Sequence, residues 1–249
     1  VVTMAPDYNP SSIHADLWLP VKQGTDPFVM MSLVHVVIHE NLVDWHFVRE
    51  QTDLPLLVRQ DNQRLLRQRD LEPGGSDEIF YFWDQRTRQA VPAPGSMGSP
   101  ERTIALGDID PALEGSYRVN GIAVQPAYEA VRREALQFSP ESTATITGID
   151  PDLLYQEARL IAKAEVVKIL GGFVITKYNN GIFTQWAQVL LLALTGHSGA
   201  KGGIDHIGAG WIRPAREILG AAKPTRIETG GLGEWLLGEH AQDAKASFN

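Results

Sequence analysis

Hydrophobic residues along the chain fall into short runs of strand length and longer runs of helix length. Residues 1–9 and 14–21 each contain a short apolar run, which predicts two strands. Residues 28–41 and 183–196 are apolar on nearly every side and predict two buried helices. Short apolar strands that alternate with buried helices are typical of an α/β fold with a parallel sheet covered by helices on both faces.

The middle of the chain has a different pattern. Residues 56–121 contain many prolines and glycines between short aromatic or β-branched runs, and the run "IFYFWDQRTRQAV" at 79–91 predicts a hairpin. Helical patterns return at 126–137 and 151–164. The run "VVKILGGFVI" at 166–175 predicts a buried strand that two glycines interrupt.

These patterns divide the chain into four parts. We expect residues 1–55 to form part of a first α/β unit and residues 56–121 to form an irregular insert with short strands. Residues 122–165 would be a helical connection, and residues 166–249 part of a second α/β unit with a loop-rich tail. The two α/β units would be Rossmann-like, with strands that lead through turns into helices.

Two helices carry the same start signal. Asp26-Pro27 precedes the first apolar helix, and Asp150-Pro151 precedes the helix at 151–164. Aspartate is a preferred N-cap residue and proline a preferred first helical residue. We therefore expect both aspartates to be N-caps, and capping alone accounts for Asp26 on local grounds.

Charge and cysteine content exclude several function classes. The formal net charge is -8, and a net acidic protein repels nucleic acid and anionic membranes. The densest basic run, residues 59–69, is typical of a solvated polar segment. The absence of cysteine excludes disulfides, thiolate zinc sites and cysteine-ligated iron–sulfur clusters within these 249 residues. No apolar run reaches the roughly 20 residues of a spanning helix, so no direct membrane insertion is expected.

Ligands of an open parallel sheet bind beyond the carboxyl ends of its strands. Three turns of this chain have that position: residues 6–9, residues 22–26, and the turn that begins at Gly171. Glycines at a strand-to-helix turn allow backbone N–H groups to approach a phosphate. The third turn has the spacing of neither the dinucleotide fingerprint nor a P-loop, so phosphate contact and simple packing both remain open there.

Histidines on the first long helix suggest a different chemistry. His35 and His39 are four residues apart and share a helix face, which could place two metal ligands together. The sequence lacks the zinc-protease order, in which glutamate follows the first histidine directly. His35 lies in an apolar run, so we expect a core histidine with a hydrogen-bonded ring, and a zinc site is the alternative.

Three segments, in this order, resemble the dimethyl sulfoxide reductase family of molybdopterin oxidoreductases. The first is "DLWLPVKQGTDPFVMMSLVHVVIHENLVDWHFVREQTDLPLLVR", with its Gly-Thr-Asp turn. The second is "QFSPESTATITGIDPDLLYQEARLIA", with Pro-Glu and Thr-Gly, and the third is "ALTGHSGAKGG". The agreement covers about residues 1 to 205. Lys22-Gln23 and "WDQRTRQAVPAP" are similar to the branch with nitrate, selenate and chlorate reductases and dimethyl sulfide and ethylbenzene dehydrogenases.

The resemblance implies a bis(molybdopterin guanine dinucleotide) cofactor with molybdenum, whose guanine dinucleotide tails the two α/β units would bind. It carries over these cofactor-binding residues: Asp7, Tyr8, Asn9, Gln23, Gly24, Thr25, Asp26, Gly171, Gly172, Lys177, Tyr178, Asn179 and Asn180. Lys177 would also face the substrate funnel as a catalytic residue. Where the family usually has an arginine at the start of the next helix, this chain has Gln185-Trp186. With the resemblance in view, Asp26 would both start its helix and hold a guanine.

The resemblance also implies a longer enzyme. The chain would be the central part of a catalytic subunit, and the iron–sulfur cysteines and the molybdenum ligand would lie in a preceding segment. The whole enzyme would carry out oxygen-atom transfer or hydroxylation on a small molecule, whereas this part alone would be inactive. We expect an iron–sulfur electron-transfer subunit as partner, in a periplasmic or membrane-associated respiratory complex. The alternatives are another nucleotide-cofactor α/β oxidoreductase and a non-catalytic scaffold that kept the fold.

Overall fold

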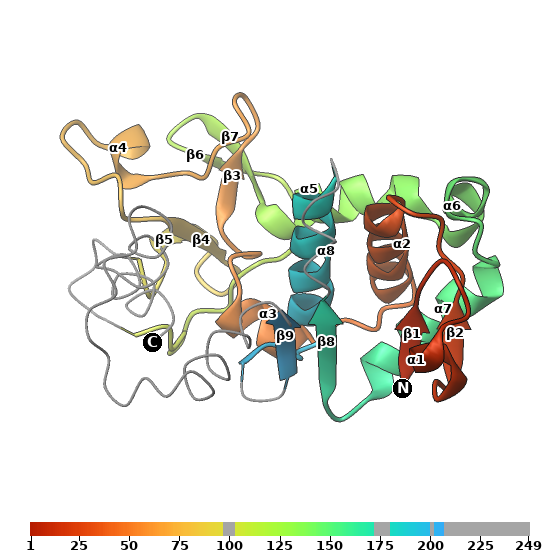
Figure 1. Ribbon diagram of the computed structural model, residues 1–249. Coiled ribbons are helices and arrows are strands. Elements are labelled where there is room, and N and C mark those ends of the chain that lie inside the picture. The colour runs from red at the N-terminus through yellow and green to blue at the C-terminus, as the bar shows by residue number, and fades with distance from the viewer. Residues whose placement is uncertain (97–102, 172–179, 200–201, 207–249) are drawn as a thin grey trace, which may run out of the picture. The chain divides into compact units, whose positions relative to one another are not determined.

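The computed structural model of the protein describes residues 1–96, 103–171, 180–199 and 202–206 (Figure 1). Its α-helices are α1 (Pro10–Ile13), α2 (Asp26–His39), α3 (Trp45–Gln51), α4 (Gln68–Leu71), α5 (Ala127–Ala135), α6 (Pro140–Thr147), α7 (Pro151–Lys163) and α8 (Gly181–Leu194), with a 3-10 turn η1 (Leu136–Phe138). Its strands are β1 (Val2–Met4), β2 (Leu17–Leu19), β3 (Leu57–Arg59), β4 (Tyr81–Asp84), β5 (Gln89–Pro92), β6 (Tyr117–Val119), β7 (Ile122–Pro126), β8 (Val167–Gly171) and β9 (Gly202–His206).

The described strands form four small sheets and not one large parallel sheet. β1 and β2 pair in parallel, β3, β7 and β6 pair antiparallel in that order, β4 pairs antiparallel with β5, and β8 lies beside β9. Asn120 and Gly121, both at positive φ, join β6 to β7, and such a two-residue turn directs the chain back antiparallel. The fold is therefore mixed α/β, and the predicted hairpin at 79–91 is confirmed.

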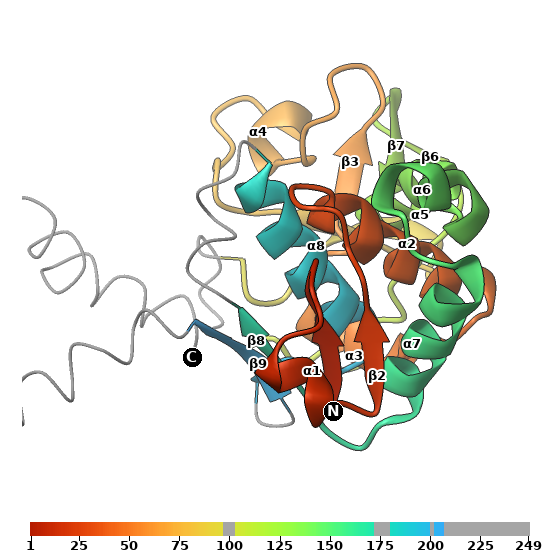
Figure 2. The same cartoon turned by 45° about the vertical axis from the view of Figure 1, so that its right-hand side comes forward.

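Helix α2 is the centre of the largest hydrophobic core. It packs against α8, α7, α6 and α5, which explains why its sequence has almost no polar face (Figures 1 and 2). Its fully or almost fully buried residues are Val29, Met30, Ser32, Leu33, Val34, His35, Val36 and Val37. The prediction of a helix buried on most sides is confirmed, and α2 starts one residue earlier than the Asp26-Pro27 start signal predicted.

Helices α2 and α8 lie side by side and point in the same direction (Figures 1 and 2). The residue that caps the next helix, Asp44, fixes their C-terminal ends together. Its backbone N–H donates to the Leu194 carbonyl at 2.8 Å, and its carboxylate caps α3 by accepting from the Phe47 N–H at 2.9 Å. The N-termini of α2 and α8 consequently lie at the same end of this pair.

The insert has small cores of its own. One contains Leu57, Leu66, Tyr81 and Val124, and the buried turn residue Asp84 closes the β4–β5 hairpin. The Asp84 carboxylate accepts from the Thr87 hydroxyl at 2.7 Å and from the Asp110 N–H at 3.0 Å, which lowers its pKa to about 2. The insert is thus held by packing that includes Val124 of β7, just beyond residue 121, and by its own polar network.

Three sequence expectations were incomplete or wrong. The short helix α1 and the helix α6 were missed, because neither has an apolar period; capping by Asn9 and Ser139 marks their starts. Strand β8 was expected to be buried, yet Leu170 is 67% exposed. Among the described residues, β9 is the only strand that pairs with β8, so the other edge of β8 has no strand beside it.

The chain divides into two units, Val1–Asp205 and His206–Asn249. The three turns that were predicted to bind a ligand all lie in the first unit. Within the described residues, no helix is long and apolar enough to cross a membrane.

Candidate functional site

The turn that leads from β2 into α2 has a backbone that only glycine adopts easily. The Thr25 N–H and the Thr25 hydroxyl both donate to the Lys22 carbonyl, at 3.1 and 2.7 Å. Gly24 stands in this turn at φ +78°, the left-handed region, although a Cβ at this position would meet no atom within 4 Å. Glycine is therefore required here for its backbone angle, and the space beside it is open.

Asp26 is not the N-cap of α2, which corrects the sequence prediction by one position. Thr25 is the N-cap, Asp26 is the first helical residue and Pro27 the second. The same dipeptide at Asp150 behaves as predicted, because the Asp150 carboxylate accepts from the Asp152 N–H at 2.9 Å. The half-buried Asp26 carboxylate has no hydrogen-bond partner among the described residues, so it is available to a ligand.

The second turn at this edge follows β1. Because β1 and β2 are parallel, the turns after them lie at the same end of the pair. Asn9 caps α1, and its side-chain oxygen accepts from the Ser11 and Ser12 N–H groups at 3.0 and 3.3 Å. Tyr8 is 62% exposed, and its ring lies edge-on to Trp18 at 5.2 Å.

Of the predicted residues in this second turn, the exposed Asp7 and Tyr8 are free of hydrogen bonds to other described residues. The oxygen of the Asn9 side chain is already engaged in capping. Gln23, in the first turn, is exposed as well. The two turns therefore place exposed side chains at the same end of the β1–β2 pair.

Helix α6 holds the Lys22–Asp26 turn in place. The Lys22 N–H donates to the Thr147 carbonyl at 3.0 Å, and the Lys22 ammonium to the Thr145 carbonyl at 3.4 Å. Thr147 is fully buried, and Gly148 ends α6 at φ +76°. This Thr-Gly pair belongs to the family resemblance, but its role in supporting the turn was not predicted; a glycine at a helix C-terminus was the available signal.

Gly148 provides a test of this support. A Cβ at Gly148 would lie 3.1 Å from the Lys22 side chain, on a backbone at φ +76°. Gly148→Ala is expected to lower the free energy of unfolding by about 1–2 kcal/mol from the backbone angle alone, and to disturb the turn as well. Chemical denaturation and cofactor content of the intact protein measure the two effects.

Gly121→Ala is the matched control for this variant. Gly121 has a similar angle, φ +84°, and a Cβ there would meet open space. It should lose comparable stability and retain as much of the expected molybdopterin cofactor as the parent protein. Equal cofactor content in Gly148→Ala and Gly121→Ala would contradict a role of α6 in holding the turn.

The third predicted turn is described only at its two ends. Gly171 is the buried last residue of β8, and Asn180 is the exposed N-cap of α8, with no side-chain capping bond. Gly172, Lys177, Tyr178 and Asn179 lie outside the described residues. Since α2 and α8 begin at the same end, Asn180 and the Lys22–Asp26 turn lie at the same end of the helix pair.

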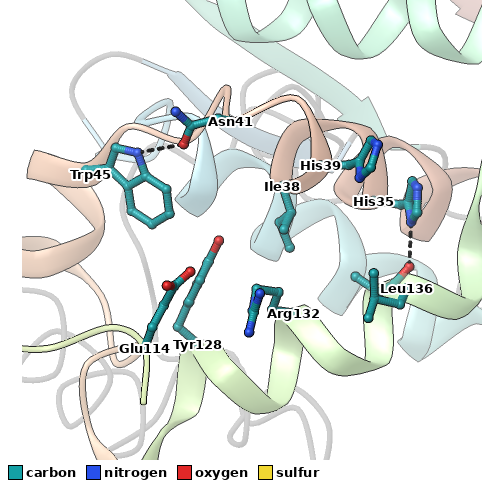
Figure 3. A pocket seen from close by; sticks show the side chains of 10 residues that line it. His35, Ile38, His39, Asn41, Trp45, Glu114, Tyr128, Arg132 and Leu136 are labelled. Atoms are coloured by element: carbon teal, nitrogen blue, oxygen red, sulfur yellow. Dashed lines mark hydrogen bonds between the residues drawn. The ribbon is translucent and has the colours of Figure 1, made fainter.

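A separate cavity lies at the other end of α2 (Figure 3). Its volume is about 220 Å³, and it lies among the C-terminal half of α2, the start of α3, and α5. Tyr128 is 1% exposed, and burial raises its pKa to about 12, so its hydroxyl keeps its proton. This cavity lies away from all three predicted turns and contains none of their residues.

The two histidines of the zinc alternative line this cavity. The His35 Nδ1 lies 2.9 Å from the Ala135 carbonyl oxygen, and the ring stacks on His39 at 5.5 Å. His35 is 8% exposed, which confirms the prediction of a hydrogen-bonded core histidine. Within the described part of the chain, no group of three or more histidine, cysteine, aspartate or glutamate side chains could hold a metal ion.

The chain is similar to part of the alpha subunits of several dehydrogenases and reductases. It is 54% identical to the dimethylsulfide dehydrogenase subunit alpha of Rhodovulum sulfidophilum and 41% identical to the chlorate reductase subunit alpha of Ideonella dechloratans, in both cases over 100% of the chain. It is 37% identical to the perchlorate reductase subunit alpha of Dechloromonas aromatica over 85% of the chain. The chain spans 28% of the length of the first two relatives and 26% of the third.

No family model matches the chain. Among solved structures, acetylene hydratase from Pelobacter acetylenicus matches with a TM-score of 0.47 and 18% identity, over 80% of this chain and 17% of that one.

Proposed function

Because the chain belongs to the dimethyl sulfoxide reductase family of molybdopterin oxidoreductases, we propose that it binds the guanine dinucleotide tails of a bis(molybdopterin guanine dinucleotide) cofactor. It would do so as the Rossmann-like central part of a molybdenum oxidoreductase catalytic subunit. The observation that carries this proposal is the Asp26 carboxylate, which stands at a helix start without a partner among the described residues, beside the turn that Gly24 makes possible.

Guanine matches the chemistry of this position. Its Watson–Crick edge offers two adjacent N–H donors, and a carboxylate is the side chain that accepts two parallel hydrogen bonds. Asp26 presents two free oxygens at the first turn of α2, where the helix dipole also favours its negative charge. In this proposal Gln23 and Thr25 flank the base, and Asp7 and Tyr8 contact its nucleoside from the neighbouring turn.

The second dinucleotide would lie at the start of α8. Gly171 and Asn180 delimit that turn, and Gly172, Lys177, Tyr178 and Asn179 would complete it. The backbone N–H groups at the start of α8 suit a phosphate, because helix N-termini attract anions. Since α2 and α8 begin at the same end, one side of the helix pair would receive both tails.

The cofactor, when bound, supplies the redox chemistry of oxygen-atom transfer or hydroxylation at molybdenum. The residues of this chain bind and orient it, and Lys177 is proposed to face the substrate. Membership of the family supports an electron-transfer partner with iron–sulfur clusters, in a periplasmic or membrane-associated respiratory complex. The relatives are named for a sulfide, chlorate and perchlorate, so the proposal extends to small-molecule substrates as a class.

Release of the cofactor tests the proposal. Acid denaturation and hydrolysis of the intact protein should yield guanosine monophosphate, molybdenum and a fluorescent oxidised pterin, with two guanines for each molybdenum. Nicotinamide or flavin in the extract would instead identify another nucleotide enzyme. A well-folded protein with no nucleotide and no molybdenum, even after expression with molybdate, would identify a scaffold.

A further inference from the structure

The insert contains a second cavity, lined mainly by arginine. Its lining comes from β3, the loop that follows it and helix α4, and its volume is about 510 Å³. The lining residues are Arg59, Asn62, Arg64, Leu65, Arg67, Arg69 and Asp70. In a chain with a net charge of -8, four guanidinium groups around one cavity are a local reversal of sign.

Two of these four arginines, Arg59 and Arg69, are neutralised by ion pairs with aspartates. Arg59 donates with two nitrogens to the Asp61 carboxylate, at 3.1 and 2.7 Å, and with a third to Asp70 at 2.7 Å. Arg69 forms an ion pair with Asp77. The other oxygen of Asp70 accepts the Arg67 N–H at 2.9 Å, so the only carboxylate in the lining is fully engaged.

Arg64 and Arg67 keep their positive charge unneutralised. Neither forms an ion pair with a carboxylate of the described residues. Arg67 is nevertheless fixed, because its guanidinium donates to the Asp77 backbone carbonyl at 3.1 Å and lies 5.3 Å from the centre of the Phe80 ring. Cation–π contact and a carbonyl acceptor hold a guanidinium in position without cancelling its charge.

Arg64 is exposed, and its backbone is also held. A tight turn forms when the Arg59 N–H donates to the Arg64 carbonyl at 2.8 Å, and the Arg64 N–H donates to the Asn62 side chain at 3.0 Å. The Arg64 side chain therefore starts from a fixed backbone, and Arg64 and Arg67 both line the cavity. Two such forks can bind several oxygens of one anion with charge-assisted hydrogen bonds.

We propose that this cavity binds a small oxyanion, of the phosphate ester or pyrophosphate class, between Arg64 and Arg67. The site is separate from the proposed guanine site, because it lies wholly within the insert and shares no residue with the Lys22–Asp26 turn. A carboxylate or a halide could form good hydrogen bonds with at most one of the two guanidinium groups. A pyrophosphate presents oxygens in two directions and can engage both.

Calorimetric titration of the intact protein with inorganic pyrophosphate tests this proposal. We expect saturable one-to-one binding that weakens as salt is added, since salt screens exposed charges. Arg64→Gln should weaken binding by about tenfold, the loss of one charge-assisted contact pair. Because Arg64 is exposed and its side chain forms no hydrogen bond or ion pair with described residues, this variant should fold normally.

Arg88→Gln is the matched control. Arg88 is exposed in the same insert, outside the cavity lining, and its removal changes the net charge equally. It should bind pyrophosphate as the parent protein does, and Arg64→Lys should bind with intermediate strength because lysine lacks the planar fork. No saturable binding at millimolar pyrophosphate, or equal weakening in Arg88→Gln and Arg64→Gln, would overturn the proposal.

Discussion

Replacement of Asp26 by asparagine is expected to weaken the binding of one of the two guanine nucleotides and so to lower the guanine content of the purified protein. An asparagine side chain has one acceptor oxygen where the carboxylate has two, and it loses the charge that strengthens both hydrogen bonds. A lost hydrogen bond to a charged group costs about 1.5–3 kcal/mol, which corresponds to roughly 10- to 150-fold weaker binding. Guanosine monophosphate released by hydrolysis, relative to protein, measures the effect.

Asp150→Asn is the control for the Asp26 variant. Both aspartates precede a proline at a helix start, yet only the Asp150 carboxylate is engaged as a cap. Asparagine is an equally good N-cap, so Asp150→Asn should leave both fold and nucleotide content unchanged. A folded Asp26→Asn protein with the full content of guanine would contradict the role of Asp26.

Replacement of Glu157 by glutamine is expected to stabilise the protein at alkaline pH. Glu157 is 8% exposed on the inner face of α7, and one of its carboxylate oxygens is buried without a partner. Burial raises the pKa of Glu157 from 4.5 to about 7, an effect that the Val1 ammonium opposes. The folded protein thus favours the protonated acid, which a glutamine resembles.

The pH dependence of this effect follows from proton linkage. Between pH 4.5 and about 7 the folded state binds more protons at Glu157 than the unfolded state, so stability falls as pH rises through this window. Below pH 4.5 both states are protonated, and above pH 7 the loss is complete. At about 1.4 kcal/mol for each pKa unit, Glu157→Gln should gain about 3 kcal/mol at pH 8 relative to pH 4.

Denaturant unfolding at the two pH values measures this gain. Glu165→Gln serves as the control, because Glu165 is an exposed glutamate just after the same helix. It should change stability little, and by the same amount, at both pH values. A difference between Glu157→Gln and the parent protein that does not vary with pH would show that the Glu157 carboxyl titrates normally.

The long elements of the fold could be predicted from sequence because their signals are local. Helices α2, α7 and α8 have long apolar periods or strong caps, and each was located to within about two residues. Helix α6 has the sequence "PESTATIT", which lacks an apolar period, and it depends on its caps and on packing against α7 and α2. An apolar period in the sequence would not reveal this capping or this packing.

The candidate site was predicted in part. The Gly24 turn and its place beside a helix start followed from the residues themselves. Whether Asp26 is the N-cap or the first helical residue depended on which residue ends the turn, and that residue is Thr25. The Thr25 hydroxyl binds the Lys22 carbonyl, and the helix therefore starts one residue earlier than the Asp-Pro signal suggests. The support from Thr147 joins residues 125 positions apart and could not follow from local patterns.

The arrangement of the strands was the least predictable part. A parallel sheet was expected from short apolar runs. Among the described strands, β1 and β2 are the pair shown to be parallel. Runs of three to five residues do not distinguish parallel from antiparallel partners, because both bury the same side chains. In the insert, turn residues such as Asn120 and Gly121 decided the pairing.

The most direct measurement is a structure of the intact protein with its cofactor, and the distance from the Asp26 carboxylate to the nearest guanine. We expect two hydrogen bonds of about 3 Å from the guanine N–H groups to the two Asp26 oxygens. We also expect the second guanine nucleotide to lie toward the start of α8. A guanine bound elsewhere, with Asp26 open to solvent or bonded only to its own helix, would contradict this expectation.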